Sequence, residues 1–499
     1  MPDDEVRGLA AERERRLEKV DALRAAGVEP YPYRFDRSTT LAELRRRHGD
    51  LPPGTETDER VQVAGRLLLI RRQGRLTFAT LRDRDDQVQL FVSLKVVGED
   101  TLAAFNDLDL GDWIGVDGVV ITTNKGELSV RVDRFELLAK ALRPLPDKWK
   151  GLADVDTRYR QRYVDLIVND EARRAFRIRH AVIASLRRGL VERDFVEVET
   201  PVLHVEVGGA HARPFVTHHN ALDLDLYLRI ALELHLKRLI VGGFERVFEI
   251  GRVFRNEGIA PKYNPEFTML EVYQAFADFT DMMTLTEALV VQAARDALGT
   301  TVVRIGDVDV DLAEPWRRAR VLDLVSAAVG RPVHPSMPIE ELRALCDEHG
   351  VAYEPHMGSG ALCMELYDAL VEPTLIAPTF VTHHPREVSP LARPDRDDPY
   401  LVERFELVGA SRELANAYSE LNDPIDQRER FEAEQRLKEA GDLEAGTVDE
   451  DYLRALEYGL PPTGGLGIGI DRLVMLLAGV TTIKEVILFP TLRPEPPPM

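Results

Sequence analysis

Two short strings place an arginine where the local chain gives no structural reason for one. Phe254-Arg255-Asn256-Glu257-Gly258 ends an alternating, strand-like run, and Gly467-Ile468-Gly469-Ile470-Asp471-Arg472 leads from a glycine-rich strand into the apolar helix Leu473–Leu477. A cation in the first turn of a helix is unfavourable, because the helix dipole is positive there. A bound anion such as a triphosphate reverses that penalty. Arg472, at the start of that helix, is therefore expected to face a bound anion.

The bulk of the chain is typical of a globular protein. Its 499 residues allow two or three domains, and its hydrophobic fraction of 44% is ordinary. No apolar run reaches the length of about 18 residues that a membrane span needs, and Met1–Glu5 is acidic with no apolar signal core. Cys346 and Cys363 are expected to be two buried thiols. Together these features predict a cytoplasmic protein with no membrane partner.

The net charge of −21 argues against a general nucleic-acid binder, whose surface should be basic. It does not exclude local basic patches on an acidic body. Lys140–Arg162 is such a patch, and composition alone favours a solvated linker there.

The N-terminal part predicts a helix followed by a small all-β module. Val6–Ala26 is rich in good helix formers and is followed by Gly27, a stop signal. The next segment contains five short alternating runs, at Val61–Leu69, Leu76–Arg82, Gln87–Val92, Trp113–Thr122 and Leu128–Leu138. Five strands suit a barrel of the oligonucleotide-binding (OB) kind, although the pattern alone leaves other small all-β modules open.

Helix and strand patterns alternate through the C-terminal part, so the whole chain is predicted to be α+β. Glu171–Asp194 predicts a helix, and Phe195–Pro201 a strand closed by proline. Helical patterns at Asp281–Leu298 and Ile339–Gly350 indicate a helical insertion over about 281–360. The predicted divisions are a lead-in at 1–59, the barrel at 60–143, a linker at 144–157 and a large domain at 158–499.

Two strand-like runs carry polar stripes. Because side chains alternate along a strand, each of these sets shares a face: Phe267, Met269, Glu271 and Tyr273, and separately Asn416, Tyr418 and Glu420. A solvated face is the ordinary explanation of such a stripe. The residues around Glu420 are neutral or apolar, however, and a buried carboxylate there would need a cation.

Glu406 and Glu413 form a further carboxylate pair. Two carboxylates often hold magnesium that bridges phosphates, whereas surface acids explain the same spacing equally well.

From Val6 to Pro494, the order of segments resembles a bacterial-type class II lysyl-tRNA synthetase. The resemblance rests on long strings: Lys140-Ala-Leu-Arg-Pro-Leu-Pro, Arg158-Tyr-Arg-Gln-Arg-Tyr, Gly208-Gly209-Ala210 with Ala212-Arg-Pro-Phe, Thr217-His-His-Asn-Ala-Leu-Asp-Leu-Asp, Val241-Gly-Gly-Phe-Glu-Arg-Val-Phe-Glu-Ile, Asn264-Pro-Glu-Phe-Thr-Met, Tyr418-Ser-Glu-Leu-Asn-Asp-Pro and Gly464–Arg472. The three class motifs correspond to Phe195–Pro201, Arg246–Tyr273 and Gly464–Leu477.

The resemblance implies a homodimer that joins L-lysine to tRNA(Lys) with ATP and Mg²⁺, on an antiparallel sheet flanked by helices. Arg255 and Arg472 would be catalytic. The implied ATP site comprises Arg255, Glu257, Asn264, Phe267, Glu406, Glu413 and Arg472, with Glu406 and Glu413 on the metal. The implied lysine site comprises Gly209, Glu233, Arg255, Glu271, Tyr273, Asn416, Tyr418 and Glu420. The implied anticodon-binding residues are Arg71, Phe78, Gln89 and Glu127.

Some positions depart from the family pattern, namely Leu232, Tyr263, Asp194 and Gly409-Ala410-Ser411. Leu232 and Ser411 are expected to flank the pocket, which leaves open a specialised paralogue, including one that lysylates an acceptor other than tRNA. An aspartate- or asparagine-type ligase is the alternative within the fold. Glu420, Glu271 and Tyr273 favour a cationic side chain over an acidic one, and the two arginines disfavour a catalytically dead relative.

Overall fold

The computed structural model describes residues 3–146, 152, 154–206, 208–439 and 446–494. The chain divides into two compact units, Met1–Ala153 and Asp154–Met499. The predicted linker at 144–157 lies partly outside the described residues, and its limits, like those of the other predicted domains, stay predictions.

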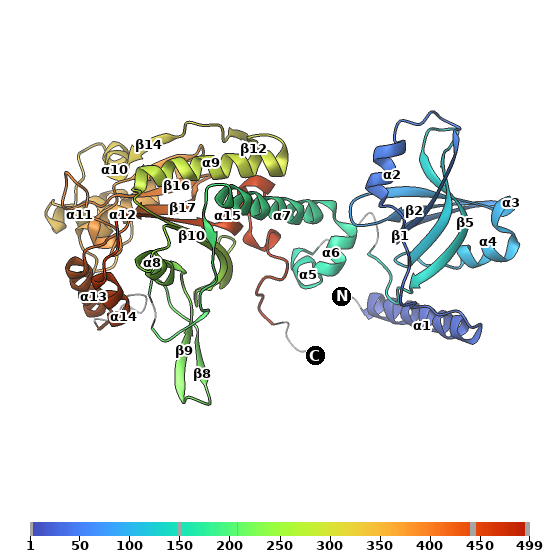
Figure 1. Ribbon diagram of the computed structural model, residues 1–499, viewed down its shortest axis with the longest axis horizontal. Coiled ribbons are helices and arrows are strands. Elements are labelled where there is room, and N and C mark those ends of the chain that lie inside the picture. Colours follow the sequence, from blue (N-terminus) through green and yellow to red (C-terminus); the bar gives the residue numbers. More distant parts are fainter. Residues whose placement is uncertain (1–2, 147–151, 153, 207, 440–445, 495–499) are drawn as a thin grey trace. The chain divides into compact units, whose positions relative to one another are not determined.

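The first unit is a closed five-stranded barrel preceded by a helix, which confirms the predicted OB-type module (Figure 1). Helix α1 (Asp3–Ala25) ends just before Gly27, whose φ of 74° lies in the left-handed region. The strands follow one another around the barrel in the order β1 (Glu56–Gln73), β2 (Leu76–Arg82), β3 (Gln87–Ser93), β5 (Leu128–Ala139) and β4 (Trp113–Thr122). The unit also contains α2 (Leu41–His48), α3 (Leu94–Val97) and α4 (Glu99–Asn106).

The second unit is built on an eight-stranded sheet. All neighbouring strands in it are antiparallel except the outer pairs β14–β15 and β10–β6, which confirms the predicted antiparallel sheet. In order across the sheet, the strands are β14 (Arg317–Arg320), β15 (Thr379–Thr382), β16 (Arg404–Gly409), β17 (Arg412–Ser419), β18 (Thr463–Gly469), β11 (Glu266–Ala275), β10 (Arg246–Phe254) and β6 (Val196–Glu197).

Three helices cover one face of this sheet: α7 (Asp170–Val191), α9 (Phe279–Leu298) and α15 (Ile470–Ala478) (Figure 1). Alternate residues of the central strands, such as Leu270, Ala417 and Ile468, enter the core beneath them. Helices α8 (Glu233–Val241) and α14 (Glu450–Glu457) pack against each other and share a smaller core with the opposite face. The side chains between the core-forming ones therefore point to that opposite face.

The segment expected to be a helical insertion, about 281–360, contains two kinds of structure. Most of α9 lies in the main core, and β14 is a strand of the main sheet. By contrast, α10 (Val321–Val329), α11 (Ile339–His349) and α12 (Ser359–Leu370) share a core of their own. Cys346 and Cys363 are free thiols buried in that second core, as predicted.

The remaining elements of the second unit are short or peripheral. They are α5 (Val155–Arg160), α6 (Arg162–Val168), β7 (Leu203–His204), β8 (Val216–His219), β9 (Leu224–Leu228), β12 (Val302–Ile305), β13 (Val308–Asp311), α13 (Pro424–Glu439) and three 3₁₀ turns at Glu372–Thr374, Arg386–Val388 and Ile483–Glu485.

The basic stretch Lys140–Arg162 is not a solvated linker throughout. The Lys140 ammonium is buried, 2.5 Å from Asp109 and 2.7 Å from Asp112. Arg162 is also buried and pairs with Asp165 at 2.6 Å. The solvated interpretation is wrong at these positions, because composition cannot show which charges have buried partners. Lys148 and Lys150 lie outside the described residues.

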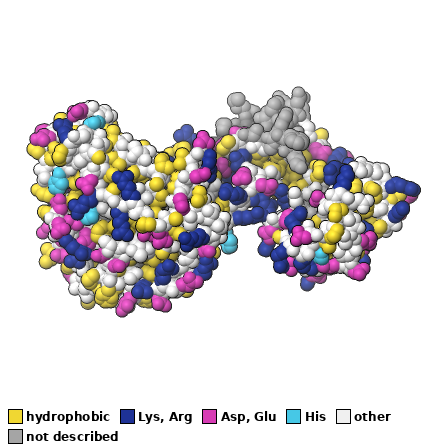
Figure 2. Space-filling model, turned by 90° about the horizontal axis from the view of Figure 1, so that it is seen from above, with side chains coloured by type: hydrophobic (Ala, Val, Ile, Leu, Met, Phe, Trp, Pro, Cys, Tyr) yellow, Lys and Arg dark blue, Asp and Glu magenta, His cyan; other side chains and the backbone are white. Residues whose placement is uncertain are grey.

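The surface carries both signs of charge. On the face seen in Figure 2, basic and acidic side chains are interspersed over both units. Within the described residues, no helix has the length and apolar character needed to cross a membrane.

The hairpin between β16 and β17 turns through two residues that are ill suited to it. Ala410 and Ser411 have φ angles of 55° and 59°, where an L side chain is strained. The turn is held by its neighbours, since the Ala410 and Ser411 amides donate to Ile376 and Leu375 and the Ser411 hydroxyl donates to Pro373.

Ala410→Gly removes a buried methyl group, but it should lower the free energy of unfolding by about 1 kcal/mol less than an ordinary buried Ala→Gly change, because glycine adopts this conformation without strain. Urea denaturation of the full chain measures the change. Ala415→Gly, in the extended part of the same hairpin, is the control and should lower stability. An equal loss at both positions would contradict the strained turn.

Candidate functional site

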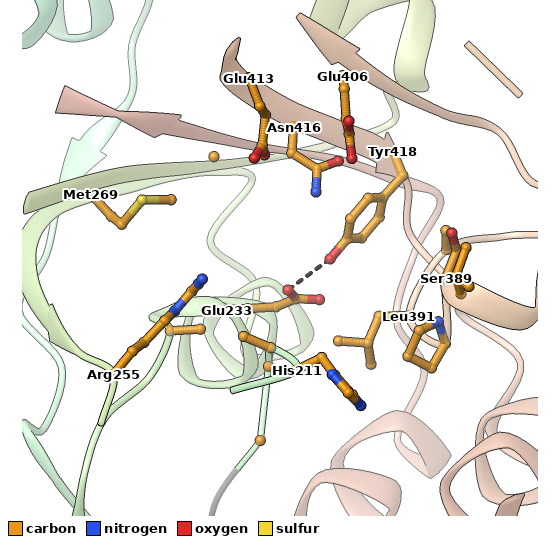
Figure 3. Close-up of a pocket in the computed structure, with 18 of the residues that line it drawn as sticks. His211, Glu233, Arg255, Met269, Ser389, Leu391, Glu406, Glu413, Asn416 and Tyr418 are labelled. Carbon is orange, nitrogen blue, oxygen red and sulfur yellow. Dashed lines mark hydrogen bonds between the residues drawn. The ribbon is translucent and has the colours of Figure 1, made fainter. Parts of the chain in front are cut away.

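A single cavity of about 640 Å³ opens on the sheet face opposite α7, α9 and α15. It is lined by every residue predicted to bind ATP or lysine: Gly209, Glu233, Arg255, Glu257, Asn264, Phe267, Glu271, Tyr273, Glu406, Glu413, Asn416, Tyr418, Glu420 and Arg472. Figure 3 shows Glu406, Glu413, Asn416 and Tyr418 reaching into the cavity from one side, with Glu233 and Arg255 across from them. The fold thus brings together the two arginine strings and both polar stripes.

Strand alternation produces this lining. On β11, Leu270 and Val272 enter the main core, whereas Glu271 and Tyr273 face the cavity. The neighbouring strands β16, β17 and β18 divide their residues in the same way. Glu271 and Glu420 are only 6% and 1% exposed, so the solvated-face interpretation of the two stripes is wrong for their acids.

Arg255 follows β10 directly and is half-buried in the cavity wall. Its guanidinium lies 5.2 Å from the centre of the Phe267 ring and donates weakly to the Ile230 carbonyl at 3.4 Å. Among the described residues, no carboxylate lies within 4.0 Å of it. Burial lowers the pKa of the Arg255 guanidinium from its usual value. A half-buried cation with no acidic partner is suited to binding an anion.

Arg472 lies in the first turn of α15, as the sequence predicts. Its Nη1 donates to the Glu413 side chain and to the Glu413 carbonyl, both at 3.0 Å. The Tyr263 ring lies 5.7 Å away over the guanidinium. The positive helix end and the two arginines face the same cavity.

In one part of the cavity, its acid end, acids converge on a buried lysine. Glu233 opens α8, and its two carboxylate oxygens accept from the Tyr418 hydroxyl at 2.7 Å (Figure 3) and from Lys237 at 2.5 Å. Lys237 also forms an ion pair with Glu420. The sequence argument that a buried Glu420 needs a cation is therefore correct, but it did not find Lys237. The i, i+4 spacing of Glu233 and Lys237 on one helix was the available signal.

Glu271 is held by two donors. Its carboxylate accepts from the Leu232 backbone N–H at 3.0 Å and from the Tyr273 hydroxyl at 3.1 Å. Burial and the nearby Glu233 nevertheless raise the pKa of Glu271 to about 7. A cation placed beside Glu271 would lower this pKa again and stabilise the ionised form.

Gly209 adjoins this acid end with φ at 87°. A Cβ there would lie 3.1 Å from the Ala231 Cβ and 3.3 Å from the Glu233 Cβ, so the conformation and the close approach both suit glycine.

Glu406 and Asn416 are paired across β16 and β17, and Arg404 contacts both. Arg404 donates to Glu406 at 2.6 Å and to the Asn416 oxygen at 3.0 Å. Burial would raise the pKa of Glu406, but His384 and Arg404 outweigh it and lower the pKa to about 2. Glu406 is therefore an ionised carboxylate at neutral pH.

Glu406 and Glu413 can contribute to a magnesium site but not complete one. Within the described residues, no group of three or more His, Cys, Asp or Glu could hold a metal ion. Two carboxylates suffice for Mg²⁺ when phosphates and water supply the other ligands. The donor set therefore fits a metal that arrives with a phosphate ligand.

The residues predicted for the adenine and ribose side occupy the β10–β11 loop and the start of β11. Glu257 is exposed at the cavity wall, and Phe267 presents its ring beside Arg255. Asn264 ties the loop to its surroundings by donating to the Glu266 carbonyl at 2.6 Å and accepting from the Thr491 amide at 3.3 Å.

The departures from the family pattern differ in their relation to the cavity. Tyr263 lines it, whereas the side chain of Ser411 points to Pro373 and does not. Leu232 acts through its backbone, since its N–H donates to Glu271. Ser411 lies in the hairpin turn two residues before Glu413, which does line the cavity.

Three of the residues predicted to read the anticodon lie together on the outside of the barrel. Arg71 and Phe78 are cross-strand partners on β1 and β2, and Arg71 donates to Gln89 of β3 at 3.4 Å. Phe78 is half-buried, while its strand neighbours Thr77 and Ala79 point inward. Glu127 is exposed in the turn before β5.

Comparison with known families agrees with both units. Residues 154–493 match the family "tRNA synthetases class II (D, K and N)", and residues 61–138 match "OB-fold nucleic acid binding domain". The chain is 53% identical to a lysine–tRNA ligase of Synechococcus sp. (strain CC9311), with 97% of this chain and 99% of the relative covered. This chain belongs to the lysine–tRNA ligase family of class II tRNA synthetases.

Other members of the lysine–tRNA ligase family are similar to this chain over nearly the same length. The Bacillus subtilis (strain 168) protein is 51% identical, with 96% of each chain covered. The Trichormus variabilis protein is 52% identical over 97% of this chain and 88% of its own length.

Glu271 should make stability depend on pH. Its folded-state pKa of about 7 exceeds its ordinary value of 4.5, so the folded state binds its proton more tightly than the unfolded state does. The stability from this group is complete below about pH 4.5 and is lost as pH rises through 7. Glu271→Gln mimics the protonated form. Its stability should exceed that of the parent by an amount that grows as pH rises through this window and reaches on the order of 3 kcal/mol above pH 7.

Urea denaturation from pH 4.5 to 8 measures this difference. Glu257→Gln, at an exposed glutamate lining the same cavity, is the control and should follow the parent profile. A Glu271→Gln profile parallel to the parent would contradict the raised pKa.

Proposed function

We propose that this protein is a lysine–tRNA ligase, which activates L-lysine with ATP and transfers it to tRNA(Lys). The observation that carries the proposal is the charge of the cavity lining. Arg255 and Arg472 line the same cavity as three buried acids, Glu233, Glu271 and Glu420. The curated relatives, each named lysine–tRNA ligase, support it over nearly the full chain.

The acid end favours lysine over aspartate or asparagine. An acidic side chain would meet three carboxylates there, and a neutral amide would leave them without a cation. A site whose buried polar groups lose their partner rejects the wrong ligand strongly. A lysylated acceptor other than tRNA is less well supported, because the chain retains the OB-fold unit.

In the first step, the lysine carboxylate attacks the α-phosphorus of ATP and pyrophosphate leaves. The carboxylate is ionised at neutral pH, so no general base is needed. Arg255 would bind the α-phosphate and the lysine carboxylate, with Asn416 also reaching that carboxylate. Arg472 would meet the γ-phosphate end. Fixed cations that face the charge developing in the transition state lower the barrier, and holding the reactants together removes an entropic cost.

The other residues would fix the two substrates. Phe267 would stack on the adenine, with Glu257 and Asn264 beside the base and ribose. Glu233 and the Gly209 backbone would hold the α-ammonium of lysine, and Glu271, Tyr273 and Glu420 the ε-ammonium, with Tyr418 keeping Glu233 in place. Magnesium, held by Glu406 and Glu413 together with the triphosphate, would neutralise phosphate charge.

In the second step, the terminal ribose hydroxyl of tRNA attacks the carbonyl carbon of the lysyl-adenylate and AMP leaves. The barrel would select the tRNA, with Phe78 stacking on an anticodon base and Arg71, Gln89 and Glu127 contacting its neighbours. We propose further that the enzyme acts as a homodimer in the cytoplasm, as the family resemblance implies.

ATP–pyrophosphate exchange with magnesium tests the activation step. Exchange should occur with lysine and with none of the other amino acids of the standard set. Arg255→Ala should reduce it about 100- to 1,000-fold, because one preorganised donor to the transition state is lost. Arg252→Ala, at a partly exposed arginine of β10 that does not line the cavity, is the matched control. No exchange with any amino acid would overturn the proposal.

The barrel's role is tested by tRNA charging. Phe78→Ala should lower kcat/KM for tRNA about 10- to 100-fold through the loss of one stacked base, while lysine-dependent exchange stays unchanged. Arg71→Ala should act in the same direction. Arg60→Ala, an exposed arginine elsewhere on β1, should charge tRNA like the parent. Equal charging by all these variants would remove the barrel from tRNA selection.

A further inference from the structure

Lys237 stands behind the acid end of the cavity and cannot touch a ligand there. Its side chain is 0% exposed, and it is not among the lining residues. Its ammonium lies 2.5 Å from Glu233 and forms an ion pair with Glu420, and both of these acids line the cavity. The Tyr418 and Tyr452 rings lie 5.6 and 6.0 Å from the ammonium.

Burying an ammonium group is costly unless ionised partners surround it. Burial lowers the pKa of Lys237, but Glu233 and Glu420 outweigh this and raise it well above its usual value. Lys237 therefore stays charged. Its place four residues after Glu233 on α8 puts both side chains on one face of the helix, so the helix itself fixes the pair.

The charges at this end of the cavity can be compared with those of the substrate. Three carboxylates converge there, from Glu233, Glu271 and Glu420, and Lys237 is the cation that pairs directly with two of them. With all three ionised, two negative charges remain unbalanced. Lysine carries two ammonium groups, at its α and ε positions, and supplies the two missing positive charges. An amino acid with a neutral side chain supplies one, and leaves a buried acid without a partner.

We propose that Lys237 is a positioning residue that sets the charge of the amino-acid pocket, so that the pocket is balanced by a substrate with two ammonium groups. The proposal rests on the proposed lysine–tRNA ligase function. Lys237 would act through Glu233 and Glu420 by holding both carboxylates in place and by removing one negative charge. Without it, three acids would face two ammonium groups, and one acid would take up a proton instead of binding the substrate.

A purely structural role predicts a different outcome. Loss of packing alone would lower the stability of the protein and reduce its activity, and it would change the KM for lysine and the KM for ATP alike. Loss of the pocket charge should raise the KM for lysine selectively, because the ATP end of the cavity is built from other residues, among them Arg255 and Arg472.

Lys237→Met tests this, because it keeps the length of the side chain and removes the charge. The KM for lysine in ATP–pyrophosphate exchange should rise about 100-fold or more, while the KM for ATP stays unchanged. Arg238→Met is the matched control, since Arg238 is the next residue of α8 and pairs with Asp449 and Asp451 rather than with Glu233, Glu271 or Glu420. It should leave the KM for lysine unchanged.

Chemical rescue separates charge from packing. Lys237→Ala removes the last three carbons and the ammonium, which propylammonium chloride can replace. Propylammonium should lower the KM for lysine of this variant toward the parent value, whereas 1-propanol, which fills the same space without a charge, should not. If Lys237→Ala does not fold, the comparison of Lys237→Met with Arg238→Met carries the test, with lysine binding measured by calorimetry.

An unchanged KM for lysine in Lys237→Met, or equal rescue by propylammonium and 1-propanol, would overturn the role of Lys237 and leave the proposed function standing. A parent enzyme that exchanges pyrophosphate with an amino acid other than lysine would instead overturn the proposed function, and with it the charge balance.

Discussion

The two faces of the large sheet serve opposite purposes, and the alternation of side chains along its central strands makes this possible. On β11, β17 and β18, every second residue enters an apolar core under three helices, and the residues between them line the cavity. A register shift of one residue would exchange the two sets. The core that stabilises the unit therefore also sets the positions of the cavity side chains, which stand on rigid strands rather than on loops.

The glycines of β18 are part of the same constraint. Gly465 lies opposite Tyr273 and Tyr418 in the sheet, and a Cβ at Gly465 would lie 1.8 Å from a Glu420 oxygen. Glycine in the middle of a strand weakens the strand. The glycines of β18 are therefore explained by the space that they leave for the side chains of neighbouring strands. The acid end of the cavity thus depends on the absence of side chains on β18 as well as on the acids themselves.

Much of this arrangement could be predicted from the sequence, because it follows from short-range rules. Period-two alternation placed Glu271 with Tyr273 and Tyr418 with Glu420, and the alternating runs after Arg60 predicted all five barrel strands. What could not be predicted depends on partners distant in sequence. Lys237 is one example, since its partner Glu420 follows β17, far from α8 in the sequence. The burial of Lys140 and Arg162 is another, because composition does not show which aspartate each will meet.

All the residues that line the cavity belong to the second unit, residues 154–499, whereas the aromatic and polar residues suited to nucleic acid lie on the barrel of the first. Under the proposed function, bond-forming chemistry and anticodon selection would be encoded in separate, uninterrupted stretches of the chain. Substitutions on the barrel would then change which RNA is served without altering how the amino acid is activated, and the converse would also hold.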